Sequence, residues 1–383
     1  MPIHETYDVL IVGARCAGAA TAMLLARAGA RVLLVERDAP GTDTLSTHAL
    51  MRGAVMLLSD WGLVPGLLAS GTPPIAVTTF AYGAERVVVP IRAGPGVDAL
   101  IAPRRNLLDA QLVGAARAAG AEIRHHTALT GIEAGADGAV RGVRLKGSQG
   151  ERLVRAGLVI GADGRRSSLA RMVGADVTRI GRNAAAVVYA HVPGLADRGT
   201  RWHYGPGIAG GAIPTNGGAH CVFVSVSPMR FRAELRGDLA TGFRRVLAEV
   251  DPELAAEVAA AGPAEEPRAF AGAPGFFRRA QGRGWALVGD AGYFKDPITA
   301  HGITDALRDA WLLSRAILNG VPLADYEKAR DALSAPLFAV TDRIAGLPRD
   351  MDALKALHLE LNAAAKAEQA WLAGELAPGS RAA

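Results

Sequence analysis

Residues 7–37 read YDVLIVGARCAGAATAMLLARAGARVLLVER, and the organisation of the rest of the chain follows from them. The apolar run Val9–Val12 is short enough for a buried strand, and Gly13 predicts a tight turn after it. Cys16–Arg27 places apolar residues on one helical face, and Val32–Val35 is a second apolar run. The pattern predicts a strand–helix–strand unit in which the helix begins at the end of the first strand.

The turn carries most of a dinucleotide-binding signature. Gly13 and Gly18 occupy the outer positions of GxGxxG, and Glu36 lies where an acid binds a ribose 2′-hydroxyl. Arg15 replaces the middle glycine, and we hypothesise that its guanidinium lies along the pyrophosphate. A strand–helix–strand unit without a nucleotide is the alternative. If a nucleotide binds, we expect contacts from the turn, the helix N-terminus and the second strand end: Gly13, Arg15, Cys16, Ala17, Gly18, Glu36 and Arg37.

Composition limits the classes of protein to which the chain can belong. Its 383 residues are 50% hydrophobic and 21% charged, as in a folded globular protein. The net charge of +5 comes without a basic run, so we expect no nucleic-acid partner. We also expect no membrane span, no signal peptide and a cytoplasmic location. Cys16 and Cys221 form no C-x-x-C pair, which argues against a disulfide scaffold, and no metal site is predicted.

Two later segments repeat the pattern of a buried strand that runs into a glycine-and-acid turn. After a short strand predicted at Arg152–Val154, a separate buried strand, Leu158–Gly161, leads into Asp163 and Gly164 in the sequence ADGRRSSLAR. A strand at residues 285–288 leads into Gly289 and Asp290, and a loop from Pro297 to Gly302 then precedes a helix from Ile303. Each segment alone is weak evidence for a ligand site.

Arg105 lies near the start of a strongly amphipathic helix predicted in the sequence RRNLLDAQLVGAARAAG. A cation is unfavourable at a helix N-terminus, so an anionic partner would explain its position. A surface arginine without a ligand is the alternative.

Taken in order, these segments resemble the motifs of the flavin monooxygenase family typified by p-hydroxybenzoate hydroxylase. Geranylgeranyl reductases and flavin-dependent halogenases share its fold. The resemblance implies that the first turn binds the ADP part of FAD and that Arg105 lies near the FAD phosphates. It also implies that Asp163 and Gly164 serve FAD and a transient nicotinamide cofactor. It assigns the remaining FAD contacts to Gly289, Asp290, Pro297, Gly302 and Ile303, with the last helix facing the pyrimidine ring of the flavin.

The resemblance predicts an α/β fold with a Rossmann-like FAD-binding domain, an inserted, mostly antiparallel β-sheet substrate domain, and C-terminal helices. Runs at residues 75–91, 185–192, 211–213 and 219–226 indicate the strands of the inserted domain. We predict a discontinuous FAD-binding domain at 1–74, 98–175 and 273–340. The substrate domain is predicted at 75–97 and 176–272, and a C-terminal helical segment at 341–383.

The activity that the resemblance implies is NAD(P)H-dependent hydroxylation of a small aromatic or polycyclic substrate by molecular oxygen. In this family the oxygen is transferred from a flavin C4a-hydroperoxide. A reductase or desaturase of the geranylgeranyl reductase type, acting on an apolar substrate, is the alternative. A halogenase is a weaker alternative, because the W-x-W-x-I-P signature is absent. The sequence does not distinguish NADH from NADPH, a monomer from a homodimer, or one substrate from another.

The sequence offers fewer candidates for catalysis than for FAD binding. His48 follows a polar loop attached to the nucleotide strand and begins a helix predicted to end at Trp61 and Gly62. Its loop makes it the first candidate for a base that activates a phenolic substrate. His301 stands within the third turn and, if protonated, would stabilise a reduced anionic flavin; a buried neutral histidine is the alternative. Ser46, His203 and Tyr204 are weaker substrate-contact candidates. We expect structural or exposed roles for the others: His125, His126, His191, His220 and His358.

Overall fold

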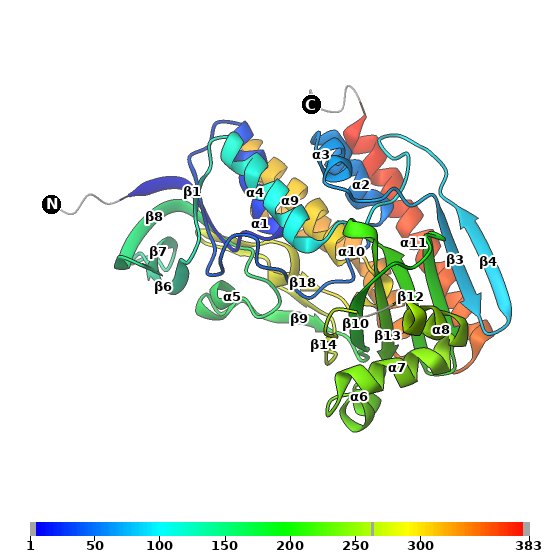
Figure 1. The fold of residues 1–383 in the computed structure, drawn as a ribbon. Helices are drawn as coiled ribbons and strands as arrows, with labels where there is room; N and C mark the ends of the chain where they lie inside the picture. Colours follow the sequence, from blue (N-terminus) through cyan, green and yellow to red (C-terminus); the bar gives the residue numbers. More distant parts are fainter. Residues whose placement is uncertain (1–4, 262–263, 378–383) are drawn as a thin grey trace.

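The computed structural model describes residues 5–261 and 264–377, which form two large sheets with helices on their faces (Figure 1). The predicted unit is present as β1 (Thr6–Val12), α1 (Cys16–Arg27) and β2 (Val32–Val35). The first sheet has the strand order β16-β17-β8-β1-β2-β5, and the β6–β7 hairpin extends it through β8. Its other strands are β5 (Glu122–Arg124), β6 (Ala128–Ala134), β7 (Val140–Gly147), β8 (Gly150–Gly161), β16 (Gln281–Gly282) and β17 (Trp285–Leu287).

The register of the parallel strands brings three distant turns to one edge of this sheet. Val12 lies opposite Val35 and Gly161, and Leu287 also lies opposite Gly161. The carboxyl ends of β1, β2, β8 and β17 are therefore level with one another. In open parallel sheets, this edge is where ligands bind.

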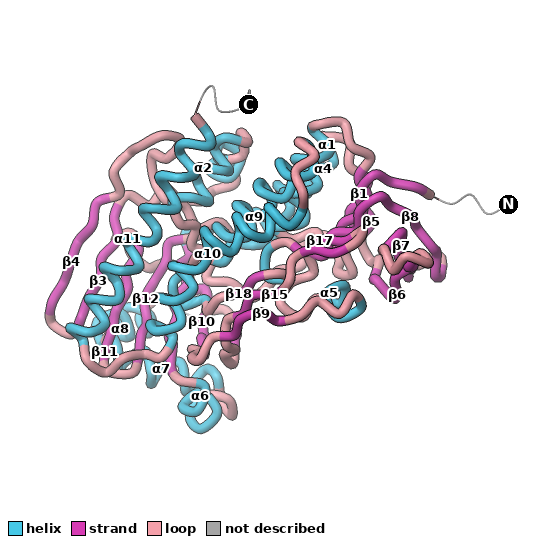
Figure 2. Tube along the Cα trace, turned by 180° about the vertical axis from the view of Figure 1, so that it is seen from behind, coloured by secondary structure: helices cyan, strands magenta, loops and turns pink. Residues whose placement is uncertain are grey.

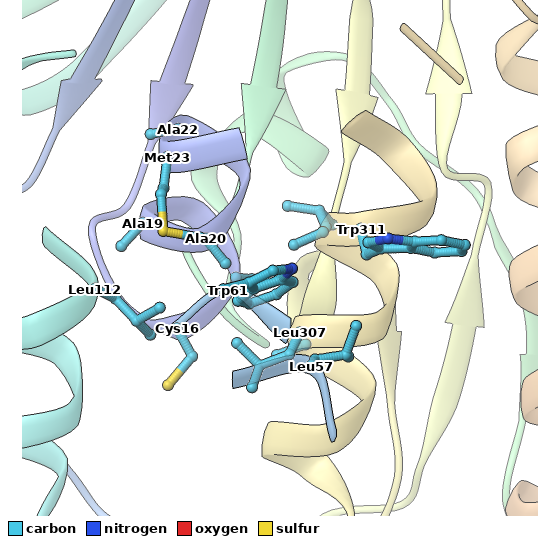
Figure 3. Packing of buried hydrophobic residues seen from close by; sticks show 14 of the residues in the cluster. Cys16, Ala19, Ala20, Ala22, Met23, Leu57, Trp61, Leu112, Leu307 and Trp311 are labelled. Atoms are coloured by element: carbon cyan, nitrogen blue, oxygen red, sulfur yellow. The ribbon is translucent and has the colours of Figure 1, made fainter. Parts of the chain in front are cut away.

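One face of the first sheet is covered by α1 together with α4 (Arg105–Ala118) and α9 (Gly302–Leu318). Alanines on α1, such as Ala19 and Ala20, are fully buried and allow close packing. Trp61, at the end of α2 (Arg52–Asp60), is buried in the same cluster (Figure 3). This apolar contact fixes the N-termini of α1, α4 and α9 relative to the sheet edge.

The second sheet has the order β14-β10-β13-β12-β11-β3-β4, and all its neighbours are antiparallel except β11 and β3. One face packs against α6 (Pro228–Glu234), α7 (Leu239–Val250) and α8 (Pro252–Ala260). The other face packs in part against α10 (Leu323–Ala345) and α11 (Met351–Leu376), which run across it in Figure 2. The strands are β3 (Val77–Tyr82), β4 (Glu85–Pro90), β10 (Ala186–Pro193), β11 (Thr200–Gly205), β12 (Ile208–Pro214), β13 (Ala219–Val226) and β14 (Arg268–Phe270).

Smaller elements join these layers. A three-stranded sheet of β9 (Val177–Ile180), β15 (Phe276–Arg278) and β18 (Tyr293–Phe294) connects the two large sheets. The short helices α3 (Val64–Ala69) and α5 (Ser168–Met172) complete the fold. The predicted fold class is therefore confirmed. Among the described residues, no helix has the length and apolar character needed to cross a membrane.

Two local predictions were wrong. His48 was predicted to begin a helix, but α2 begins at Arg52. His48 has a left-handed backbone with φ of 67°, and Leu50 pairs with Ile101 in an isolated β-bridge, so the chain is extended before the helix. The runs near residues 152 and 158 were predicted as separate strands, but they form the single strand β8.

Candidate functional site

The first turn is packed so closely that only glycine fits at two of its positions. A Cβ atom on Gly13 would lie 2.5 Å from the carbonyl oxygen of Ala162, and one on Gly18 would lie 1.8 Å from that of Gly13. Gly13 also has φ of 105°. The first turn therefore lies directly against the residue that precedes Asp163. Glu36 caps the turn, because its carboxylate accepts hydrogen bonds from the amides of Ala14 (2.8 Å) and Asp38 (3.1 Å).

Arg15, which replaces the middle glycine, has a fixed position beside the N-terminus of α1. Its guanidinium donates to the carbonyl of Thr42 (2.8 Å) and to Asp38 (3.2 Å) and Asp109 (3.3 Å). Asp109 also binds Arg105 through both carboxylate oxygens, at 3.1 and 3.2 Å. The two guanidinium groups thus share the carboxylate of Asp109, and Arg15 also binds Asp38, so each cation where α1 and α4 begin is matched by a carboxylate.

Cys16 and Arg105 differ in whether their side chains have a polar group left for a ligand. Burial raises the pKa of the Cys16 thiol, and Cys16 donates to Asp109 at 3.1 Å, so it is a packed thiol. Nε of Arg105 is buried and has no hydrogen-bond partner in the described part of the chain. An anionic ligand would satisfy that donor. The side chain of Arg37 is exposed, and its Nε lies 3.8 Å from the carboxylate of Asp38.

We call the three glycine-and-acid turns corners: the first at Gly13–Gly18, the second at Asp163–Gly164 and the third at Gly289–Asp290. The second corner is held in place by the helix that follows it, α5. The carboxylate of Asp163 accepts from the hydroxyl of Ser167 (2.5 Å) and the amide of Ser168 (2.6 Å). Ser167 in turn caps α5 by accepting from the amide of Ala170. Gly164 has φ of 76° with open space around its Cα. The side chain of Asp163 is therefore engaged, while the backbone at Gly164 faces free volume.

The third corner lies against the first helix. A Cβ atom on Gly289 would lie 2.8 Å from the side chain of Ala17. Asp290 follows in a short 3-10 helix, Gly289–Ala291, and forms no side-chain hydrogen bond within the described residues. Burial and the charge of Asp305 raise the pKa of its carboxyl to about 6, opposed by Arg105 and Arg165. Asp290 is thus a partly buried carboxylate that is available to a ligand.

The loop after this corner leads to the N-terminus of α9. Pro297 begins a 3-10 turn, Pro297–Thr299, Ala300 has a left-handed φ of 54°, and Gly302 begins the helix with an exposed backbone. His301 is buried, and its Nδ1 donates to the carbonyl of Thr299 at 2.8 Å. Burial and the nearby charge of Lys295 lower its pKa. A lowered pKa favours the neutral imidazole, which is the alternative named for His301 from the sequence.

The loop also touches the second sheet. Ala300 belongs to the same buried apolar cluster as Tyr189, Phe223 and Cys221. His48 and His191 lie beside that cluster, with Nε2 atoms 2.8 Å apart. His48, His191 and Cys221 each place a potential ligand atom within 4.8 Å of the others. The sheet face that adjoins the third corner is thus apolar, with two imidazoles at one end.

The other substrate candidates lie in different places. The amide of Ser46 donates to the hydroxyl of Tyr189 at 3.2 Å, which puts Ser46 next to His48. His203 lies on the face covered by α8, where its Nδ1 is 3.1 Å from Asp251. Tyr204 is packed against α10 and α11 and stacks on Tyr82. The structure brings Ser46 and His48 together and separates both from His203.

Sequence reasoning missed three residues of this region. His191 was expected to be structural, yet it pairs with His48 from a strand 143 residues away. Glu265 binds His191 from the segment before β14. Neither pairing leaves a local signal. Asp109, by contrast, lies one helical turn after Arg105, and this spacing is typical of an ion pair that the sequence could have revealed.

The geometry fits FAD. The first and third corners touch through Ala17, and the first and second touch through Ala162. The junction combines two helix N-termini, a free carboxylate at Asp290 and an unpaired guanidinium nitrogen at Arg105. These are the groups that bind phosphates and sugar hydroxyls.

The comparison with protein families decides between a flavin site and an empty strand–helix–strand unit. Residues 6–325 match the FAD binding domain family. The chain belongs to this family. FAD is accordingly the cofactor, as the sequence predicted, and the resemblance to flavin monooxygenases is confirmed.

Relatives with named activities support the same assignment. The chain is 32% identical over 249 residues to aklavinone 12-hydroxylase DnrF from Streptomyces peucetius. The aligned residues cover 58% of this chain and 50% of the relative. It is 28% identical over 361 residues to 6-methylpretetramide 4-monooxygenase from Streptomyces rimosus, covering 88% and 81%. The chain thus spans about half the length of the aklavinone hydroxylases that it matches.

Among solved structures, PqsL from Pseudomonas aeruginosa has the same fold. Its TM-score is 0.76 at 22% identity, with 92% of this chain and 100% of that chain covered. At this identity the likeness establishes the fold alone.

Proposed function

We propose that this protein is an FAD-dependent monooxygenase that hydroxylates a polycyclic aromatic substrate. The observation that carries the proposal is the contact between the third corner and the aromatic face of the second sheet, where Ala300 packs with Tyr189 and Phe223. A planar apolar substrate on that face would lie next to the flavin. FAD, when bound and reduced by NADH or NADPH, supplies the activation of molecular oxygen.

The residues proposed to hold FAD come from all three corners. Glu36 binds the ribose, Arg105 and the N-terminus of α1 bind the phosphates, and Asp290 binds a sugar or ribitol hydroxyl. The amides at Gly302 and Ile303 face the flavin ring and stabilise negative charge on it through the dipole of α9. We also propose the predicted division into an FAD-binding domain and a substrate domain at 75–97 and 176–272.

The reaction class is tested with isotopically labelled oxygen. The FAD-loaded protein is supplied with NADH or NADPH and with aklavinone or 6-methylpretetramide, and the products are analysed by mass spectrometry. We expect a product that carries one labelled oxygen atom. A product that gains two hydrogens and no label would instead support the reductase. Oxidation of the nicotinamide cofactor that no substrate accelerates would contradict a hydroxylase of such substrates.

Asp290→Ala should weaken FAD binding by about 10- to 100-fold, because a hydrogen bond to a charged acceptor is lost, which is worth about 1.5–3 kcal/mol. The measurement is a titration of flavin fluorescence. Asp290→Asn keeps an acceptor oxygen without the charge. Its dissociation constant for FAD should therefore lie between those of the unchanged protein and Asp290→Ala. If Asp290→Ala binds FAD as tightly as the unchanged protein does, Asp290 has no role in the site.

A further inference from the structure

His48 and His191, which lie beside the apolar face of the second sheet, form part of a continuous hydrogen-bonded chain. Nε2 of His48 is 2.8 Å from Nε2 of His191, and Nδ1 of His191 is 3.0 Å from the carboxylate of Glu265. His48 and His191 are 1% and 2% exposed, whereas the side chain of Glu265 is 48% exposed. The chain therefore runs from a buried position to the protein surface.

The carboxylate at the outer end is held in its charged form. Arg104 donates to both oxygens of Glu265, at 2.9 and 3.3 Å. Partial burial opposes ionisation, but these hydrogen bonds and the positive charge nearby outweigh it and lower the pKa of Glu265. His191, Arg104 and Glu265 also line a surface pocket of about 440 Å³. A proton that reaches Glu265 thus has access to water.

The carboxylate dictates the tautomer of each ring. An ionised carboxylate only accepts, so Nδ1 of His191 carries the hydrogen. In a neutral His191, Nε2 is then the acceptor, and Nε2 of His48 must donate to it. The remaining nitrogen, Nδ1 of His48, is left with a free lone pair. That atom is buried and has no partner in the described part of the chain.

The surroundings of both rings favour their neutral forms. Burial, followed by the neighbouring His191, lowers the pKa of His48 well below its ordinary value. Burial and then Arg104 lower the pKa of His191, opposed by Glu265. Other titratable or charged groups that face the pair are Asp43, Arg105, Tyr189 and Cys221.

The backbone at His48 also indicates a functional constraint. A left-handed φ of 67° at a histidine is rare and costs on the order of 1–3 kcal/mol. The hydrogen bond from the amide of His48 to the hydroxyl of Ser46 (3.0 Å) helps to hold this conformation. The result is that His48 reaches His191 while leaving Nδ1 free.

We propose that His48, His191 and Glu265 form a proton relay that removes a hydroxyl proton from the bound substrate and delivers it to the surface pocket. This proposal rests on the proposed function. The substrate O–H bond breaks as an N–H bond forms at Nδ1 of His48. The hydrogen on Nε2 of His48 passes to Nε2 of His191, and that on Nδ1 of His191 passes to Glu265, which releases it to water. Both rings stay neutral, and no oxidant or reductant is needed.

The arrangement of hydrogens can be tested without a substrate. Long-range proton–nitrogen NMR spectra of the FAD-loaded protein, labelled at histidine, report which ring nitrogen is protonated. At neutral pH we expect the hydrogen on Nε2 of His48 and on Nδ1 of His191, with both rings uncharged. Glu265→Ala should release His191 from this single tautomer. A hydrogen on Nδ1 of His48, or a charged His48, would overturn the proposal.

The transfer itself is followed by stopped-flow absorbance with alizarin, a hydroxyanthraquinone whose colour changes when its phenol ionises. We expect His191→Gln, which cannot pass a proton, to slow ionisation of the bound probe by a factor on the order of 10². His220→Gln removes a buried histidine from the opposite face of the same sheet and should leave the rate unchanged. In His191→Ala, added imidazole should restore it. Equal rates in His191→Gln and the unchanged protein would remove His191 from any relay.

Elemental analysis tests whether His48, His191 and Cys221 instead bind a metal ion. One tightly bound transition-metal ion per chain, lost in Cys221→Ser, would identify a metal site and overturn the relay. Labelled oxygen in the product together with the wrong tautomers would leave the proposed monooxygenase intact and remove only the relay.

Discussion

Gly18→Ala is expected to abolish tight FAD binding and to lower stability by about 3 kcal/mol, the upper end of the usual cost of overpacking. The added methyl group would lie 1.8 Å from the carbonyl oxygen of Gly13 and 3.0 Å from the side chain of Ala162. Gly13 belongs to the first corner, and Ala162 lies next to the second. To relieve both contacts, α1 must move away from these two corners. Denaturant unfolding measures the loss of stability, and a fluorescence titration measures the affinity for FAD.

Gly114→Ala is the matched control for this change. Gly114 is an exposed residue inside α4, and a Cβ atom there meets nothing within 4 Å. Alanine favours a helix over glycine by up to about 1 kcal/mol, so this variant should be slightly more stable and bind FAD normally. If the two variants behaved alike, close packing of the turn would not be the reason for the glycine at position 18.

Arg308→Met is expected to destabilise the protein by about 3–5 kcal/mol, because it leaves buried carboxylates without their cation. Arg308 is fully buried in α9 and binds Asp309 at 2.7 Å, Asp305 at 3.2 Å and Glu368 of α11. Lys295, 2.6 Å from Asp305, is then the remaining cation bound to these carboxylates. Thermal or denaturant unfolding gives the change in free energy.

The control for Arg308 is an exposed ion pair that also involves α11, between α10 and α11. Arg343 of α10 lies 2.6 Å from Glu360 of α11, and their side chains are 58% and 49% exposed. Arg343→Met should cost at most about 1 kcal/mol, since exposed pairs are screened by water. A cost for Arg308→Met no larger than that for Arg343→Met would show that the buried cluster does not stabilise the attachment of α11.

The first and third corners illustrate what the sequence predicts well. Gly13, Gly18 and Glu36 have spacings set by a single tight turn and one helix, so a local pattern locates them. Gly289 and Asp290 follow a strand whose apolar run is visible in the sequence. In each case the relevant geometry lies within about thirty residues, and the parallel register then brings the corners together.

The substrate side could not be predicted in the same way. The contact of His48 with His191 depends on the cross-strand order of the second sheet, which joins segments far apart along the chain. His48 was placed in a helix because the apolar periodicity that follows it is helical. The isolated bridge of Leu50 to Ile101 overrides that local preference. Side-chain partners from distant strands determine the chemistry here.

The most direct test is the amount of FAD that the purified chain binds. If the three corners form one dinucleotide site, a titration followed by flavin absorbance and fluorescence should reach saturation at one FAD per chain. Gly18→Ala should fail to saturate over the same concentration range. A correctly folded protein that takes up no FAD would contradict the account.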